Sequence, residues 1–158
     1  MNTPRPFRID VPQAAIDDLH ARIRANRWPD KETVDDWEQG IPLAVVQDFA
    51  TYWAKQYDWR KCEAAVNAYP QFLIELDGVD IHFLHIRSPH TAARPLIMTH
   101  GWPGSVLEFM EVIEPLTNPE DPADAFHLVI PSLPGSAFRE SHPRQGGPSP
   151  RLRRRGMT

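Results

Sequence analysis

Residues 95–114 read PLIMTHGWPGSVLEFMEVIE, and the expected structure changes twice within this stretch. The opening apolar run, PLIMT, lacks alternation, which is typical of a strand buried on both faces. HGWPG follows at 100–104 and predicts a loop, because Gly and Pro interrupt regular structure. Ser105 and Glu108 then match the S-x-x-E capping box, which predicts a helix running to about Glu114. A loop that leaves the carboxyl end of a strand and opens a helix is where α/β proteins bind ligands.

The segments on either side of this loop predict the rest of a sheet. Runs of period two at 72–76 and 79–86 flank Asp77-Gly78, the pair that a type I′ hairpin turn favours because both positions need a positive φ. The apolar run HLVIPSL at 127–133 predicts another strand after a polar loop. Strand, capped helix and strand form a right-handed βαβ unit on a parallel sheet. The expected fold class is therefore α/β, with a hairpin followed by a βαβ unit.

The first seventy residues have a helical period instead. Pro12 fits the first turn of a helix, with Asp10 as the expected cap, and Pro70 ends a third helix that begins at an Asp58 cap. Tryptophans 28 and 37 are expected to anchor the loop after the first helix. The second helix carries an aromatic face that we interpret as core packing, formed by Val46, Phe49, Trp53 and Tyr57.

Composition excludes several classes of protein. The chain has 158 residues and a formal net charge of −4, so the whole molecule is not a basic nucleic-acid binder. Cys62 is the only cysteine, which excludes a disulfide within the chain and suits a reducing compartment. The amino-terminal residues lack the apolar segment of a secretory signal, and no apolar run approaches the ~18 residues of a membrane span. We therefore expect a cytoplasmic protein that binds neither nucleic acid nor membrane.

A break in composition predicts three regions. Residues 136–158 contain six arginines and one acidic residue, with no apolar periodicity, and predict a disordered basic tail. Their Arg-, Pro- and Gly-rich text resembles a GC-rich gene read in a shifted frame. The predicted division is a helical region at 1–70, a strand-rich region at 71–135 and the tail at 136–158.

Six short motifs together resemble the microsomal-type epoxide hydrolases. The resemblance covers residues 7 to about 135 and implies an amino-terminal helical meander followed by the first strands of an α/β-hydrolase sheet, incomplete in this chain. The motifs are FRID at 7–10, RWP at 27–29, YDWR at 57–60, Glu63 and Asn67 with PQF at 70–72, DGVDIHF at 77–83, and HGWPGS at 100–105.

The resemblance also implies roles for the HGWP loop. Trp102 would donate a backbone N–H to an oxyanion hole, and its bond to Pro103 would be cis. His100, Gly101 and Pro103 would set the geometry of the loop, with His100 as a structural residue.

The family opens epoxides through a covalent ester. An Asp nucleophile attacks one carbon, two Tyr hydroxyls donate to the epoxide oxygen, and a His–carboxylate pair activates the water that cleaves the ester. In the family these groups follow the last strand found here, so we expect this chain to be an amino-terminal fragment that lacks nucleophile and base and is inactive alone. The intact relative would hydrate a small-molecule epoxide to a vicinal diol, without a metal or organic cofactor.

Other interpretations stay open at this point. The chain could be a non-catalytic module that docks onto a hydrolase domain or a partner chain, or a dehalogenase or esterase relative. RLRRR at 151–155 could bind nucleic acid, which predicts strong salt dependence. His82 and His85 are expected on opposite faces of a strand, which argues against a shared metal. The PLIMT strand, with Ile97, is expected to leave an exposed sheet edge that favours self-association.

Overall fold

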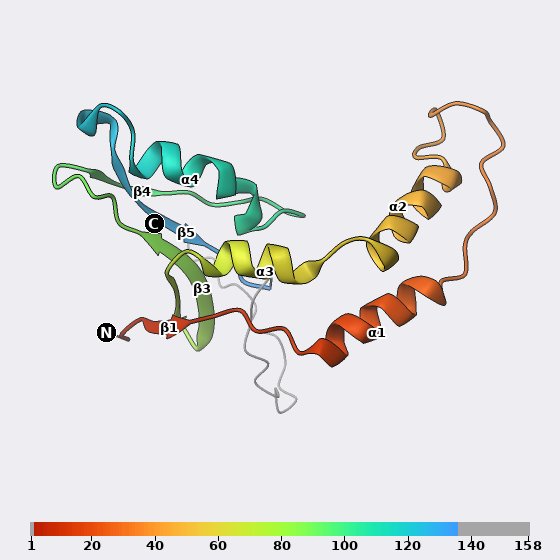
Figure 1. Ribbon diagram of the computed structural model, residues 1–158, viewed down its shortest axis with the longest axis horizontal. Helices are drawn as coiled ribbons and strands as arrows, with labels where there is room; N and C mark the ends of the chain where they lie inside the picture. Colours follow the sequence, from red (N-terminus) through yellow and green to blue (C-terminus); the bar gives the residue numbers. More distant parts are fainter. Residues whose placement is uncertain (1, 136–158) are drawn as a thin grey trace, which may run out of the picture.

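The computed structural model describes residues 2–135, and its five strands form one sheet in the order β1-β2-β3-β5-β4 (Figure 1). The tail predicted at 136–158 lies outside the described residues. β4 and β5 are parallel, whereas the other neighbouring strands are antiparallel. The predicted hairpin and βαβ unit are confirmed. The bounds are Arg5–Phe7 for β1, Gln71–Leu76 for β2, Val79–Ile86 for β3, Arg94–Ile97 for β4 and Phe126–Pro131 for β5.

The turn between β2 and β3 follows from its two residues. Asp77 has a φ of 51° and Gly78 a φ of 77°, as a type I′ turn requires. Leu76 therefore pairs with Val79, which sets the register of the whole hairpin.

Within residues 2–135, four α-helices accompany the sheet: α1 (Gln13–Arg24), α2 (Leu43–Lys55), α3 (Trp59–Asn67) and α4 (Met110–Thr117). Asp58 caps α3 by accepting a hydrogen bond from the Arg60 N–H, as predicted. The prediction that Asp10 caps α1 is wrong, because α1 begins after Pro12 and no side chain caps it. The described part of the chain also contains two short 3-10 turns: η1 (Val106–Phe109) leads into α4, and η2 (Pro122–Asp124) precedes β5.

The core lies on one face of the sheet. Alternate residues of β3 and β5 point toward α3 and α4, because side chains of a strand alternate between its faces. Leu84, Leu128 and Ile130 are fully buried there. Val66 of α3, Val106 of η1 and Ile113 of α4 pack against them, together with Ile9 from the segment before α1. We call this the covered face.

The opposite face of the sheet carries apolar side chains that no described helix covers, and we call it the open face. Ile97 is 68% exposed there, beside Val129 and His85 of the neighbouring strands. The expectation that the PLIMT strand is buried on both faces is therefore wrong for this chain. β4 forms the edge of the described sheet and packs on only one of its two faces.

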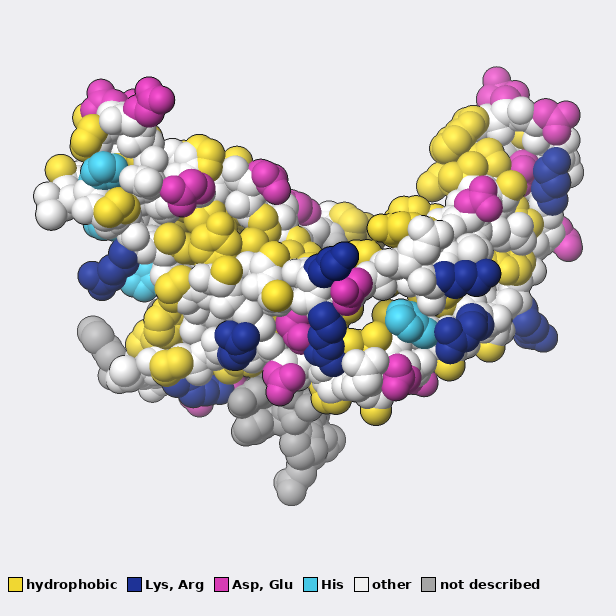
Figure 2. Space-filling model, in the orientation of Figure 1, with side chains coloured by type: hydrophobic (Ala, Val, Ile, Leu, Met, Phe, Trp, Pro, Cys, Tyr) yellow, Lys and Arg dark blue, Asp and Glu magenta, His cyan; other side chains and the backbone are white. Residues whose placement is uncertain are grey.

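The helices α1 and α2, with their connecting loop, extend away from the sheet as an arm of residues 13–55 (Figure 1). No residue of α2 is buried, and Phe49 is 68% exposed. The interpretation of its aromatic face as core packing is wrong, and Trp37 in the loop is also exposed rather than anchored. Figure 2 shows hydrophobic side chains at the surface of both the arm and the sheet region.

β1 was not predicted from the sequence. Its three residues pair with β2, so the region before residue 70 contributes a strand as well as helices. Among the described residues, no helix is long and apolar enough to cross a membrane.

Candidate functional site

The HGWP loop connects β4 to η1 at the carboxyl end of β4. The Trp102–Pro103 peptide bond is cis, as the resemblance implied. The Gly104 N–H donates to the Gly101 carbonyl at 2.8 Å and closes the turn. A Cβ at Gly104 would meet the carboxylate at the end of the Glu108 side chain. A residue larger than glycine at this position would therefore require only that the flexible Glu108 side chain move.

Ser105 begins η1 as an N-cap. Its hydroxyl accepts a hydrogen bond from the Leu107 N–H at 3.3 Å. The predicted helix is present: it starts as the 3-10 turn η1 and continues as α4 to Thr117, three residues past the expected end near Glu114. The capping box thus marks the start of the helical segment correctly, and the expected end lies three residues short.

His100 is 4% exposed and joins two loops. Its Nδ1 lies 3.1 Å from the Gly101 carbonyl oxygen, and its Nε2 lies 3.1 Å from the backbone nitrogen of Leu133. A carbonyl can only accept and a backbone N–H can only donate. The ring is therefore neutral, with its proton on Nδ1, and it ties the HGWP loop to the segment that follows β5.

These contacts orient the peptide group between Gly101 and Trp102. In a planar trans peptide the C=O and the following N–H point in opposite directions. Because His100 and Gly104 both donate to the Gly101 carbonyl, the Trp102 N–H must point away from them. Within residues 2–135, no group accepts a hydrogen bond from this N–H. Such a preorganised donor can stabilise an oxyanion.

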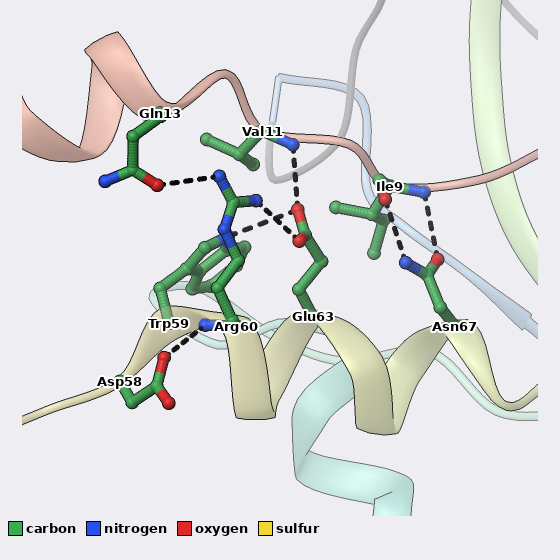
Figure 3. Close-up of polar contacts among 8 residues, drawn as sticks. All are labelled: Ile9, Val11, Gln13, Asp58, Trp59, Arg60, Glu63 and Asn67. Atoms are coloured by element: carbon green, nitrogen blue, oxygen red, sulfur yellow. Dashed lines mark hydrogen bonds and ion pairs between the residues drawn. The ribbon is translucent and has the colours of Figure 1, made fainter.

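The motif formed by Glu63 and Asn67 is a clamp on the segment before α1 (Figure 3). The Asn67 side chain accepts from the Ile9 N–H at 3.0 Å and donates to the Ile9 carbonyl at 2.8 Å. Glu63 accepts from the Val11 N–H at 2.8 Å and from Arg60 at 2.6 Å. The Val11 N–H, more than the Arg60 charge, lowers the pKa of Glu63. The clamp holds Ile9 in the core.

The remaining histidines of the sheet lie apart. His82 shares the covered face with Leu84, whereas His85 lies on the open face. Burial lowers the pKa of His82 to about 4. Burial also lowers the pKa of His85, with smaller contributions from the charges of Arg87 and His127. The described residues contain no group of three or more His, Cys, Asp or Glu side chains that could hold a metal.

The groups of a nucleophilic site are not assembled among residues 2–135. No described histidine donates to or accepts from a described carboxylate. Sequence reasoning assigned the loop residues His100, Gly101, Trp102 and Pro103, and the structure places all four in one turn. It did not identify Leu133, which contacts His100, nor Gln71 and Ser132, which both contact His82. The one available signal was the PQF motif, which contains Gln71 but gave it no role.

Comparison with known proteins identifies close similarity to one family. A family model described as the epoxide hydrolase N terminus matches residues 4–109. A putative epoxide hydrolase of Stigmatella aurantiaca (strain DW4/3-1) is 50% identical over 145 residues, which cover 89% of this chain and 33% of the relative. Epoxide hydrolase 1 of Sus scrofa is 34% identical over 150 residues, which cover 90% of this chain and 33% of that protein.

Solved structures of epoxide hydrolases are also similar to this chain. Epoxide hydrolase of Aspergillus niger matches with a TM-score of 0.78 and 33% identity, over 91% of this chain and 38% of that chain. Juvenile hormone epoxide hydrolase of the silkworm Bombyx mori matches with a TM-score of 0.79 and 30% identity, over 88% of this chain and 35% of that one. The chain thus spans about a third of the length of the curated relatives it matches. Its sequence, its fold and the family model agree that this chain belongs to the epoxide hydrolase family.

Proposed function

We propose that this chain supplies the oxyanion-binding loop of an enzyme that hydrates epoxides to vicinal diols. Trp102 donates its backbone N–H to the carbonyl oxygen of the covalent Asp ester. When water attacks the ester carbon, that oxygen gains negative charge, and the N–H stabilises it until the carbon–oxygen bond to the diol breaks. His100, Gly101 and Pro103 hold the loop in the shape that aims this donor.

One observation carries this proposal. The Gly101 carbonyl is occupied by His100 and by Gly104, which leaves the Trp102 N–H directed outward without an acceptor among the described residues. Leaving a backbone N–H without a partner is costly in a folded protein unless solvent or a ligand accepts it. Trp102 is 89% exposed, so the loop is accessible.

We further propose that the nucleophile, the His–carboxylate pair and the two Tyr donors come from the parts of the relatives that this chain does not match. The proposal is supported by the coverage, since the matched region is 33% of the Stigmatella relative. An oxyanion donor has nothing to stabilise without an attacking group, so we expect the chain alone to be inactive.

A chimera tests the role of the loop. Residues 1–135 of this chain would replace the matching third of the Stigmatella relative, and turnover of styrene oxide would be measured. Trp102→Pro removes the donor N–H, whereas Trp102→Phe retains it. We expect Trp102→Pro to lower kcat by about 10²–10³, the usual effect of losing one such donor, while the ester accumulates in acid-quenched samples.

The Phe variant is the matched control and should keep most of the activity. Equal turnover in the Pro and Phe variants, with both chimeras folded, would reject the oxyanion role. A folded chimera that retains its Trp102 but hydrates no epoxide would reject the broader assignment.

A second candidate function is a non-catalytic module that docks onto a hydrolase domain. The arm favours it, because Phe49, Tyr52 and Trp53 line an apolar groove with Leu19 and are not buried by any described element. Capture of the separately expressed catalytic part of the relative by this chain, lost when Phe49 and Trp53 are changed to Ser, would support docking.

A further inference from the structure

We propose that Gln71, His82 and Ser132 form a positioning network that sets the geometry of the HGWP loop through Leu133 and His100. The inference rests on the proposed role of the loop and adds a second layer of residues behind it. None of these three side chains touches the loop directly. Each acts through the next residue along the network.

Ser132 is the link between the network and the loop. It is 3% exposed, and His82 holds it twice, at 2.8 Å from the Ser132 N–H to the His82 carbonyl and at 2.8 Å from the Ser132 hydroxyl to His82 Nδ1. The next residue, Leu133, donates its N–H to His100 Nε2. A shift of Ser132 therefore moves the donor that fixes the His100 ring.

Gln71 fixes the direction of every proton in the network. Its amide nitrogen donates to the Val66 carbonyl at 3.2 Å and to Asn67 Oδ1 at 2.8 Å. Its amide oxygen therefore faces His82 Nε2 at 3.0 Å and must accept a hydrogen bond from an N–H there. His82 Nδ1 is then left to accept from the Ser132 hydroxyl. His82 carries its proton on Nε2, whereas His100 carries its proton on Nδ1.

The network also reaches the amino-terminal segment. Asn67, which accepts from Gln71, clamps Ile9 with its two backbone hydrogen bonds. An apolar side chain in place of His82, which is 1% exposed, would avoid the cost of burying a polar ring. The polar network instead connects the segment before α1 to the loop that carries Trp102, by way of α3, β2, β3 and the segment after β5.

Ring-nitrogen NMR of the full chain tests the proposal directly. Two-bond proton–nitrogen spectra at neutral pH distinguish the two neutral forms of each imidazole. We expect His82 protonated on Nε2 and His100 protonated on Nδ1. A proton on Nδ1 of His82, or a signal averaged between the two forms, would overturn the network without any variant.

Variants then test the coupling to the loop. Ser132→Ala removes the hydroxyl, and we expect the Leu133 amide to exchange about tenfold faster with solvent, as loss of a well-held hydrogen bond allows. We also expect the His100 signals to move toward a mixture of both neutral forms. Ser132→Thr restores the hydroxyl and should restore both measurements.

Ser88→Ala is the matched control. Ser88 is also buried and accepts a hydrogen bond from the His90 N–H, but it lies beyond the other end of β3. It should leave Leu133 and His100 unchanged. Unchanged Leu133 exchange and an unchanged His100 in Ser132→Ala would overturn the proposal. Neither measurement depends on turnover, so failure here is separate from failure of Trp102 in the chimera.

Discussion

The two faces of the sheet are built from the same strands but differ in what covers them. On the covered face Leu84 is fully buried beneath α3 and α4, whereas its neighbour Phe83 on the open face is only half-buried and stacks against Phe72 at 5.6 Å. Strand alternation places apolar side chains on both faces, but only one face has helices among the described residues. Stability in this chain therefore comes mainly from one side of the sheet, while the HGWP loop lies at its edge.

Alanine substitutions at Leu84 and Phe83 should show the largest difference in the free energy of unfolding between the two faces. We expect Leu84→Ala to lower the free energy of unfolding by about 2–5 kcal/mol, because it leaves a cavity in the core. Phe83→Ala should cost less than Leu84→Ala, since the Phe83 ring is only partly buried and no described helix packs over it. Urea unfolding followed by circular dichroism measures both. Equal losses would mean that the open face is covered in solution.

The acid dependence of stability should follow His82 of the covered face. An unfolded histidine binds a proton near pH 6.5, whereas burial lowers the pKa of His82 to about 4 in the folded chain. Between these values the unfolded chain binds more protons. The contribution of neutral, buried His82 to the free energy of unfolding is thus complete above pH 6.5. As the pH falls toward 4, the free energy of unfolding decreases by up to about 3 kcal/mol.

Unfolding in urea between pH 7.5 and 4.5 measures this effect. The window separates His82 from Glu63 and Glu32, whose lowered pKa values act below 4.5. His85→Gln, on the open face, should keep most of the slope, whereas His82→Gln should flatten it. A slope that survives in His82→Gln would assign the effect to another group.

The clamp formed by Glu63 and Asn67 holds Ile9 in the core on the covered face. Asn67→Ala leaves the Ile9 N–H and carbonyl without their partners in a buried position, which should cost about 1–3 kcal/mol. Asn2→Ala is the control, because its side-chain bond to the Glu75 carbonyl is exposed and should contribute little. Thermal unfolding distinguishes them, and a neutral Asn67→Ala would show that the segment before α1 is not held by this contact.

A substitution at Ile97 tests the open face. Among these variants it is expected to change the free energy of unfolding least. We propose that the exposed β4 edge and this face promote self-association, which Ile97→Lys should reduce by adding a charge at the edge. Sedimentation and binding of the dye ANS measure it. Ile81→Lys adds a charge to the open face on the interior strand β3, and so separates the contribution of the face from that of the edge. Association that is unaffected by Ile97→Lys would place the contact elsewhere.

Local signals in the sequence predicted much of the fold. Asp77-Gly78 sets its turn through two positive φ angles, and Asp58 caps α3 through its own neighbour. β1 could not be predicted, because three residues have no measurable period. The aromatic side chains of α2 were misassigned, since a helical stripe does not reveal whether another surface covers it.

In the candidate site too, features with a local sequence signal were predicted, and contacts between distant segments were not. The HGWP loop was found from its own residues and from the family resemblance. The contact between His100 and Leu133 joins residues 33 positions apart, so it depends on β4 and β5 lying side by side. No spacing in the sequence indicates that contact.

The most direct test of the account is a turnover assay of the chain alone. We propose that residues 2–135 supply an oxyanion donor, while the groups that attack the epoxide belong to the regions of the relatives that this chain does not match. The purified chain would be incubated with styrene oxide, and the diol separated by chiral chromatography. We predict racemic product at the rate of the buffer control. Enantioselective diol formation that persists through repurification would contradict the account.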